Sequence, residues 1–303
     1  MNRREFIGLA AGAAVVSGCA SAKAGDCVKG RILFGACRGP QDTALMKKIG
    51  YDFFEWNVAS AFIPDEKDPA KWAKKKGEIL SAALPIRSCN GFLPGKFRLT
   101  GPNADFAPAL DYAEVACRRA DEVGLKVIVF GSGGARNVPG DFAEKDRKNW
   151  PDTQKGAEQF ADFCRQLAAR IADCKVSVVL EPLCPKESNI VNFVWQGLQI
   201  CEDIGSPRIQ QLADLYHMMM GREDPESIVK AGSRLLHCHI ATKNTRQYPG
   251  ANDTDAFKPY FAALKKIGYT GGVSCECGWG KKEDFEKNLV TALATMKELA
   301  GQA

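Results

Sequence analysis

A regular alternation of short apolar runs and longer amphipathic stretches, from residue 31 to the C-terminus, constrains the fold most strongly. The apolar runs have strand length and are rich in β-branched or aromatic residues, at 31–35, 51–56, 84–90, 125–131, 176–181, 208–214, 234–240 and 271–278. The stretches between them predict helices at 41–49, 69–82, 104–123, 152–173, 192–204, 225–231, 254–267 and 282–300. Strands that alternate with helices in this way predict an α/β fold, the (β/α)8 TIM barrel, as a single domain over residues 31–303.

The length of 303 residues suits such a barrel. An open, doubly wound sheet is the main alternative, but no Gly-x-Gly-x-x-Gly segment follows the first expected strand. The glycine-rich stretch 131–134 (GSGG) follows the fourth strand instead, where it is interpreted as a flexible strand-to-helix turn.

The first 30 residues stand apart from this pattern. Arg3 and Arg4 precede a short apolar run, 6–16, which is too short to cross a bilayer as a helix. This arrangement resembles a twin-arginine export signal, and residues 16–19 (VSGC) resemble a lipobox, which is cleaved before a cysteine that receives lipid. We therefore predict a signal peptide at 1–18, a tether at 19–30, and a lipoprotein on the periplasmic side, attached to the membrane only through lipid on Cys19.

Charge and cysteine usage narrow the function classes. The net charge of +5 is spread without a cationic stripe, so nucleic-acid binding is not expected. An exported protein with twelve cysteines would ordinarily form disulfides. However, Cys89, Cys117, Cys164 and Cys275 lie inside apolar runs, and we expect them to be free and buried.

Four polar residues end successive strands in the second half of the chain. In a TIM barrel the chemistry lies at the C-terminal ends of the strands. Glu181 and Asp214 end the fifth and sixth expected strands, and His239 and Glu276 lie near the ends of the seventh and eighth. Three carboxylates and one imidazole suit one divalent metal ion of the Mn²⁺, Co²⁺ or Mg²⁺ type.

The segments around these residues resemble the ketose 3-epimerases, a group of xylose-isomerase-like TIM barrels. The matching segments are 181–183 (EPL), 214–218 (DLYHM), 237–239 (HCH), 274–276 (SCE) and 246–250 (RQYPG). The resemblance implies that Glu181, Asp214, His239 and Glu276 hold the metal, and that Glu187, His217 and Arg246 bind the substrate. Cys184-Pro185 stand where the family commonly has Asn-Arg, and the His239-to-Arg246 spacing is one residue longer, so the sugar is not specified. His237 is expected to lie deeper in the core.

The predicted ligand set suggests a sugar isomerase or epimerase. Glu181 and Glu276 would act as acid and base on a proton α to a carbonyl, through an enediolate stabilised by the metal. The substrate would be a small sugar or a keto-glycoside. A 3-keto-glycoside lyase or hydratase could use the same site, and a non-catalytic sugar-binding lipoprotein is a further alternative. An apurinic endonuclease needs many histidines, whereas this chain has three.

The first half of the chain is expected to supply walls of the pocket. Glu55-Trp56 ends the second expected strand, and Trp279 follows Glu276. These aromatic side chains are expected either to stack on a sugar ring or to pack the barrel rim. The sequence leaves the oligomeric state open.

Overall fold

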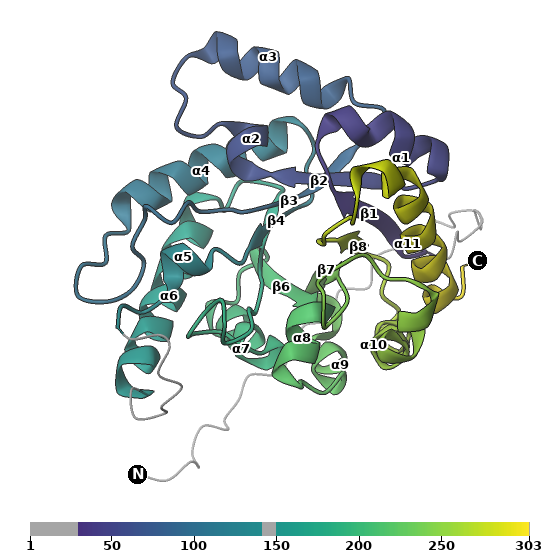
Figure 1. Cartoon of the computed structure of the whole chain (residues 1–303). Coiled ribbons are helices and arrows are strands. Elements are labelled where there is room, and N and C mark those ends of the chain that lie inside the picture. Colours follow the sequence, from purple (N-terminus) through teal and green to yellow (C-terminus); the bar gives the residue numbers. More distant parts are fainter. Residues whose placement is uncertain (1–29, 141–149, 303) are drawn as a thin grey trace, which may run out of the picture. The chain divides into compact units, whose positions relative to one another are not determined.

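The computed structural model describes residues 30–140 and 150–302, which include almost all of the predicted barrel. Its strands form a closed parallel barrel in sequence order (Figure 1), and β1 is hydrogen-bonded to β8. The strands are β1 (Leu33–Cys37), β2 (Phe53–Asn57), β3 (Ile86–Asn90), β4 (Val127–Phe130), β5 (Ser177–Leu180), β6 (Ile209–Asp214), β7 (Leu235–Ile240) and β8 (Gly272–Cys275). Closure confirms the TIM-barrel prediction and excludes the open sheet.

Helices cover the outside of the barrel (Figure 1). The helices that correspond to predicted ones are α1 (Thr43–Ile49), α3 (Pro69–Leu80), α4 (Ala107–Glu122), α6 (Trp150–Arg170), α7 (Val194–Ile204), α9 (Glu226–Ala231), α10 (Thr254–Lys266) and α11 (Phe285–Ala300). Three further helices, which were not predicted from the sequence, begin within three residues of a strand end: α2 (Val58–Phe62), α5 (Gly133–Arg136) and α8 (Leu215–Gly221). Asn57 and Asp214 start two of them, because their side chains accept backbone N–H groups of the first turn.

Local sequence explains where the main elements begin and end. The residues of β4 (VIVF) and β5 (SVVL) are all buried, as expected for parallel strands covered by helices. Asp68 caps α3 ahead of Pro69, and Gly50 ends α1 with a φ of 106°, a backbone conformation that glycine adopts without strain.

The inside of the barrel is divided into an apolar and a polar part. Val127, Val129, Val179 and Leu212, from β4 to β6, form a small apolar cluster. β2, β3, β7 and β8 carry the buried polar side chains Glu55, Ser88, His237, His239 and Ser274, and β5 and β6 add Ser177, Gln211 and Asp214. Buried polar side chains are therefore most numerous on the side of the barrel that contains both histidines of β7.

Some details differ from the sequence-based expectations. β1 begins two residues later than predicted, at Leu33, and so extends to Cys37. All ten cysteines in the described part of the chain are free, and Cys89, Cys117, Cys164 and Cys275 are buried, as predicted. The predicted signal peptide and the lipidation site Cys19 lie outside the described residues. Among the helices that the structure describes, none combines the length and hydropathy of a membrane span.

Candidate active site

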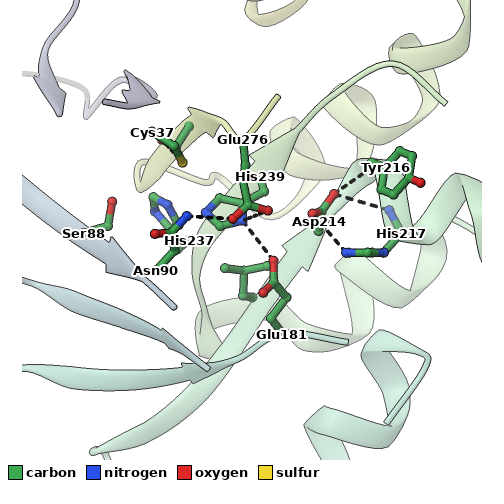
Figure 2. A network of polar contacts seen from close by, with 12 residues as sticks. Cys37, Ser88, Asn90, Glu181, Asp214, Tyr216, His217, His237, His239 and Glu276 are labelled. Carbon is green, nitrogen blue, oxygen red and sulfur yellow. Dashed lines mark hydrogen bonds and ion pairs between the residues drawn. The ribbon is translucent and has the colours of Figure 1, made fainter. Parts of the chain in front are cut away.

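The structure brings the four predicted metal ligands together at the C-terminal mouth of the barrel. Glu181, Asp214, His239 and Glu276, called the ligand ring below, each offer one ligand atom, and these atoms lie within 4.8 Å of one another. Nδ1 of His239 lies 2.9 Å from Oε1 of Glu181 and 3.5 Å from Oε2 of Glu276. In Figure 2 the two glutamates extend toward His239 from opposite directions, with Asp214 to one side.

Asp214 and Glu276 are each oriented through one carboxylate oxygen. Oδ1 of Asp214 accepts the N–H groups of Tyr216 and His217 at the start of α8, which leaves Oδ2 facing the ring. Oε1 of Glu276 accepts a hydrogen bond of 2.7 Å from Nδ2 of Asn90, at the end of β3. Asn90 was not predicted as a site residue from the sequence, because an asparagine that ends a strand usually serves as a local turn or cap.

Glu181 depends on a glycine beside it. A Cβ atom on Gly131 would lie only 2.2 Å from Oε2 of Glu181, so no larger residue at 131 leaves that carboxylate in place. The segment 131–134, predicted to be a flexible turn, therefore packs closely against Glu181 at Gly131. The fully buried Arg136 donates to the backbone oxygens of Glu181 and Phe130, which joins the ends of β4 and β5.

A second group of polar residues lies beneath the ring and was not predicted as a unit. Glu55 has no exposed surface and accepts three hydrogen bonds: 2.9 Å from Nε2 of His239, 2.9 Å from Nε2 of His237 and 2.6 Å from Oγ of Ser88. We call Glu55, Ser88 and His237 the Glu55 network. Its presence shows that His237 is buried, as expected, but that Glu55 is a partner of His239 rather than a residue of the pocket wall.

Burial and charge shift the pKa values of the ring in opposite directions. Burial raises the pKa of Asp214 to about 6, and burial together with repulsion from Glu276 raises the pKa of Glu181. Burial also opposes ionisation of Glu276, but the neighbouring charge of His239 outweighs it and holds the pKa at about 2. Burial disfavours the charged form of His239, yet Glu55 and Glu276 raise its pKa well above the ordinary value.

The donor set of the ring fits a divalent cation. It combines three carboxylates with one imidazole, and such hard oxygen and nitrogen donors suit Mn²⁺, Co²⁺ or Mg²⁺. Burial, together with the charge of Glu276 nearby, raises the pKa values of Glu181 and Asp214 and so opposes their ionisation. A cation among them would favour their ionisation instead.

The residues predicted to bind substrate lie next to the ring. Nη1 of Arg246 is 2.6 Å from Oε1 of Glu187, and its Nη2 is 3.4 Å from Oε2 of Glu276. Nδ1 of the buried His217 accepts the backbone N–H of Cys184 at 3.1 Å. The neutral imidazole of His217 therefore carries its proton on Nε2. This atom has no hydrogen-bond partner within the described residues and lies 3.7 Å from Oδ2 of Asp214.

The two tryptophans proposed as walls pack against protein. Trp56 lies on the outer side of β2, with the Lys75 ammonium of α3 4.9 Å from its ring centre. Trp279 stacks on Tyr248 at a centroid distance of 6.0 Å and meets the edge of Phe285. For both, the structure supports packing over sugar stacking.

Comparison with known proteins agrees with this geometry. The model of the family described as the xylose isomerase-like TIM barrel matches residues 43–299. The L-ribulose 3-epimerase of Methylomonas sp. (strain DH-1) is 34% identical over 237 residues, which cover 76% of this chain and 74% of that protein. The ketose 3-epimerase of Arthrobacter globiformis is 32% identical over 232 residues, which cover 76% of this chain and 74% of that protein.

Solved structures show the same fold. The D-psicose 3-epimerase of Clostridium cellulolyticum H10, solved with D-tagatose, superposes with a TM-score of 0.74 at 17% identity and covers 89% of this chain and 99% of its own. The 3-keto-D-glucoside 4-epimerase of E. coli gives a TM-score of 0.65 at 20% identity and covers 87% of this chain and 100% of its own. With the family model matched across nearly the whole barrel and two epimerases more than 30% identical, the chain belongs to the xylose isomerase-like TIM barrel family.

Proposed function

We propose that this protein is a divalent-metal-dependent ketose 3-epimerase in which Glu181 and Glu276 move the proton. The observation that carries the proposal is the position of the two glutamates, which come from β5 and β8 and reach the same Nδ1 of His239, at 2.9 and 3.5 Å. The relatives named as L-ribulose and ketose 3-epimerases support the reaction type.

The proton transfer uses two carboxylates on different sides of the substrate. One glutamate removes the proton from the carbon next to the ketose carbonyl, and the other glutamate gives a proton back to the opposite face of that carbon. Removal and return on opposite faces invert one centre and leave every other bond unchanged. A divalent cation held by Glu181, Asp214, His239 and Glu276 supplies Lewis-acid stabilisation of the negative charge that develops on the sugar oxygens.

The residues beside the ring supply substrate contacts in this proposal. Nε2–H of His217 is buried and points toward Asp214 without a partner in the described residues, so it is placed to donate to a sugar oxygen. Arg246 joins Glu187 to Glu276, which puts further hydroxyl-binding groups next to the acid–base pair. Cys184 lies beside Glu187 and His217, and its backbone N–H sets the tautomer of His217.

The proposal is tested by proton exchange in D₂O. The chelated protein, with and without added Mn²⁺, is incubated with D-psicose, D-tagatose, L-ribulose and D-fructose, and the products are separated and analysed by NMR. We expect Mn²⁺-dependent formation of a 3-epimer that carries deuterium at C3. Absence of both epimer and deuterium for every ketose, with metal bound, would reject the epimerase proposal.

A 3-keto-glucoside is included in the panel because the same proton abstraction serves other reactions. A lyase or hydratase would release an aglycone, or remove or add water, and would yield no epimer. A 3-keto-glucoside epimerase would yield the 4-epimer with deuterium at C4. Consumption of this substrate alone would therefore move the proposal to keto-glycosides while keeping the metal and the two glutamates.

We also propose, from sequence alone, that the protein is exported as a lipoprotein. The support is the Arg3-Arg4 pair and the lipobox-like segment that ends at Cys19. In a bacterial host fed radioactive palmitate, the wild-type protein should be labelled and Cys19→Ala should not. Equal labelling of the two proteins would reject the proposal.

A further inference from the structure

The Glu55 network contacts the ligand ring at His239, through one hydrogen bond from Glu55 and through the edge-on packing of His237 on the His239 imidazole. Oε1 of Glu55 lies 2.9 Å from Nε2 of His239, and both side chains have no exposed surface. A carboxylate without a proton can only accept hydrogen bonds, so Nε2 of His239 must carry its proton there. When His239 binds a cation through Nδ1, that atom gives up its proton, so the imidazole is neutral, its one proton lies on Nε2, and the Nδ1 lone pair faces the space beside Glu181 and Glu276.

The orientation of the His239 ring is determined from both ends. Nε2 faces Glu55 and Nδ1 faces Glu181, each at 2.9 Å. A ring turned over by 180° about its Cβ–Cγ bond would present carbon atoms to both carboxylates and lose both contacts. Glu55 therefore selects both the tautomer and the rotamer of His239 that direct Nδ1 toward the other residues of the ligand ring.

Glu55 is itself held by two residues outside the ligand ring. Oε2 accepts hydrogen bonds from Nε2 of His237 at 2.9 Å and from Oγ of Ser88 at 2.6 Å. The edge of Phe53 packs on His237, and Gly272 leaves room for that ring, since a Cβ there would lie 3.1 Å from its Nδ1. The carboxylate is thereby held by hydrogen bonds from Ser88 on β3 and His237 on β7, in addition to the one from His239.

We propose that Glu55 is a positioning residue for the metal site, which acts by presenting Nδ1 of His239 to the cation while Ser88 and His237 hold its carboxylate. This inference rests on the proposed metal-dependent function. Partners of this kind behind a ligating histidine typically change metal affinity or activity by about 10–100-fold when they are removed.

The test measures Mn²⁺ binding directly, by electron paramagnetic resonance of free Mn²⁺ during titration of the chelated protein. Glu55→Gln keeps the volume and one carbonyl acceptor but removes the charge. We expect its Kd for Mn²⁺ to rise by about 10–100-fold. Turnover lost at low Mn²⁺ should return at saturating Mn²⁺, whereas damage to the fold would not be rescued by metal.

The matched control is Glu223→Gln. Glu223 is also a buried carboxylate, but it accepts the backbone N–H of Val194 at the start of α7 and does not belong to the ring. Its Kd for Mn²⁺ should equal that of the wild-type protein. A Glu223→Gln change as large as that of Glu55→Gln would overturn the inference, because any buried charge would then have the same effect.

The outcomes separate this inference from the proposed function. Wild-type protein that binds no divalent cation would overturn both, whereas wild-type binding with an unchanged Kd in Glu55→Gln would overturn the role of Glu55 alone. If Glu55→Gln does not fold, Ser88→Ala decides, since it removes one of the groups that hold Glu55 and leaves the charge. A weaker Kd for Mn²⁺ in Ser88→Ala supports the inference, and an unchanged Kd overturns it.

Discussion

The ligand ring and the Glu55 network lie on neighbouring levels of one barrel, but their carboxylates are satisfied in opposite ways. Glu55 accepts hydrogen bonds from two imidazoles and a hydroxyl. Although burial opposes its ionisation, the charges of His239 and His237 hold its pKa well below the usual range. In the ring, Glu181 and Asp214 are buried near other carboxylates and have raised pKa values.

This difference indicates that the ligand ring, and not the Glu55 network, is the group of residues that binds a cation. Protein groups supply all the hydrogen bonds to the Glu55 carboxylate, so the Glu55 network can form a rigid support beneath the ligand ring. The ring gathers negative charge that the described protein groups compensate only in part, which favours a cation. Glu276 is intermediate, because Asn90 and His239 stabilise its charge even without a metal.

The largest effect is expected when both acid–base groups of the ring are removed. A positioned general acid or base contributes about 10²–10⁴-fold in rate, so the Glu181→Gln, Glu276→Gln double variant should lose at least that much turnover. The amides retain the size and one ligating oxygen of each side chain. Substrate deuterium exchange measures the loss, with Glu223→Gln as the control that should stay active. Turnover near wild type, with metal bound, would remove both glutamates from the mechanism.

The next effect comes from displacing one ring carboxylate without changing its chemistry. Gly131→Ala would place a Cβ 2.2 Å from Oε2 of Glu181, which is too close, so the Glu181 side chain must move. A displacement of about 1 Å at a reacting group can cost about 10²-fold, and we expect kcat to fall by that order. Thermal unfolding should change little, because the end of a flexible side chain gives way.

Gly77→Ala is the matched control for this substitution. Gly77 lies within α3, and a Cβ there meets nothing within 4 Å. Replacing a helical glycine by alanine stabilises by roughly 0.5–1 kcal/mol, so this variant should be active and slightly more stable. Wild-type kcat in Gly131→Ala would show that the close packing of Glu181 is not needed.

The ring and the network differ in how far sequence could reveal them. Each ring residue ends a strand or lies near its end, so the barrel prediction alone places them on one rim. Glu55 lies inside β2, and its partners His237 and His239 are 182 and 184 residues away. Finding that contact requires the register of the closed barrel, which strand propensity does not provide.

Two further errors have the same physical origin. The predicted first strand lay two residues too early, because the apolar run starts before the hydrogen-bonded ladder, and so Cys37 was left out of the barrel. The glycines at 131–134 were interpreted as flexible, although Gly131 is required by the approach of Glu181. Propensity describes local backbone preference, whereas both features depend on contacts between distant strands.

The third prediction uses pH to compare the ring with the network in the metal-free protein. Asp214 has an ordinary pKa of 3.8 and a folded-state pKa of about 6, so between these values the folded state keeps a proton that the unfolded state releases. The free energy of unfolding should therefore fall as pH rises from about 4 to about 6, by up to about 3 kcal/mol from this group. The lowered pKa of Glu55 acts in the opposite direction and stabilises the fold above its ordinary pKa.

Asp214→Asn isolates this contribution, because asparagine is also a good helix N-cap and should preserve the start of α8. Chemical denaturation of the chelated wild-type and variant proteins at pH values from 4 to 7 measures the difference in stability. As pH rises, the free energy of unfolding of Asp214→Asn should increase relative to that of the wild-type protein. A stability difference that is constant with pH, or that moves in favour of Asp, would show that the ligand ring does not raise the pKa of Asp214.

The smallest effect is expected at Arg246, which lies outside the ring and is partly exposed. A hydrogen bond to a charged group contributes about 1.5–3 kcal/mol, and the lower value applies here because the side chain of Arg246 is 36% exposed and water can replace part of its contact. Arg246→Ala should therefore raise KM for the sugar by about tenfold. Metal stoichiometry should be unchanged, because a guanidinium cannot ligate a cation and the ring residues remain.

Arg170→Ala is a suitable control, since Arg170 is 35% exposed and pairs with Asp111 on the outer helices. Its KM should equal that of the wild-type protein. Loss of bound metal in Arg246→Ala would mean that Arg246 supports Glu276 as a ligand, and would extend the ring to include it. A change in KM with full metal occupancy would instead show that Arg246 binds substrate and that the ligand ring alone binds the cation. The contact of 3.4 Å from Nη2 of Arg246 to Oε2 of Glu276 would then link a substrate-binding residue to a metal ligand without itself being needed for metal binding.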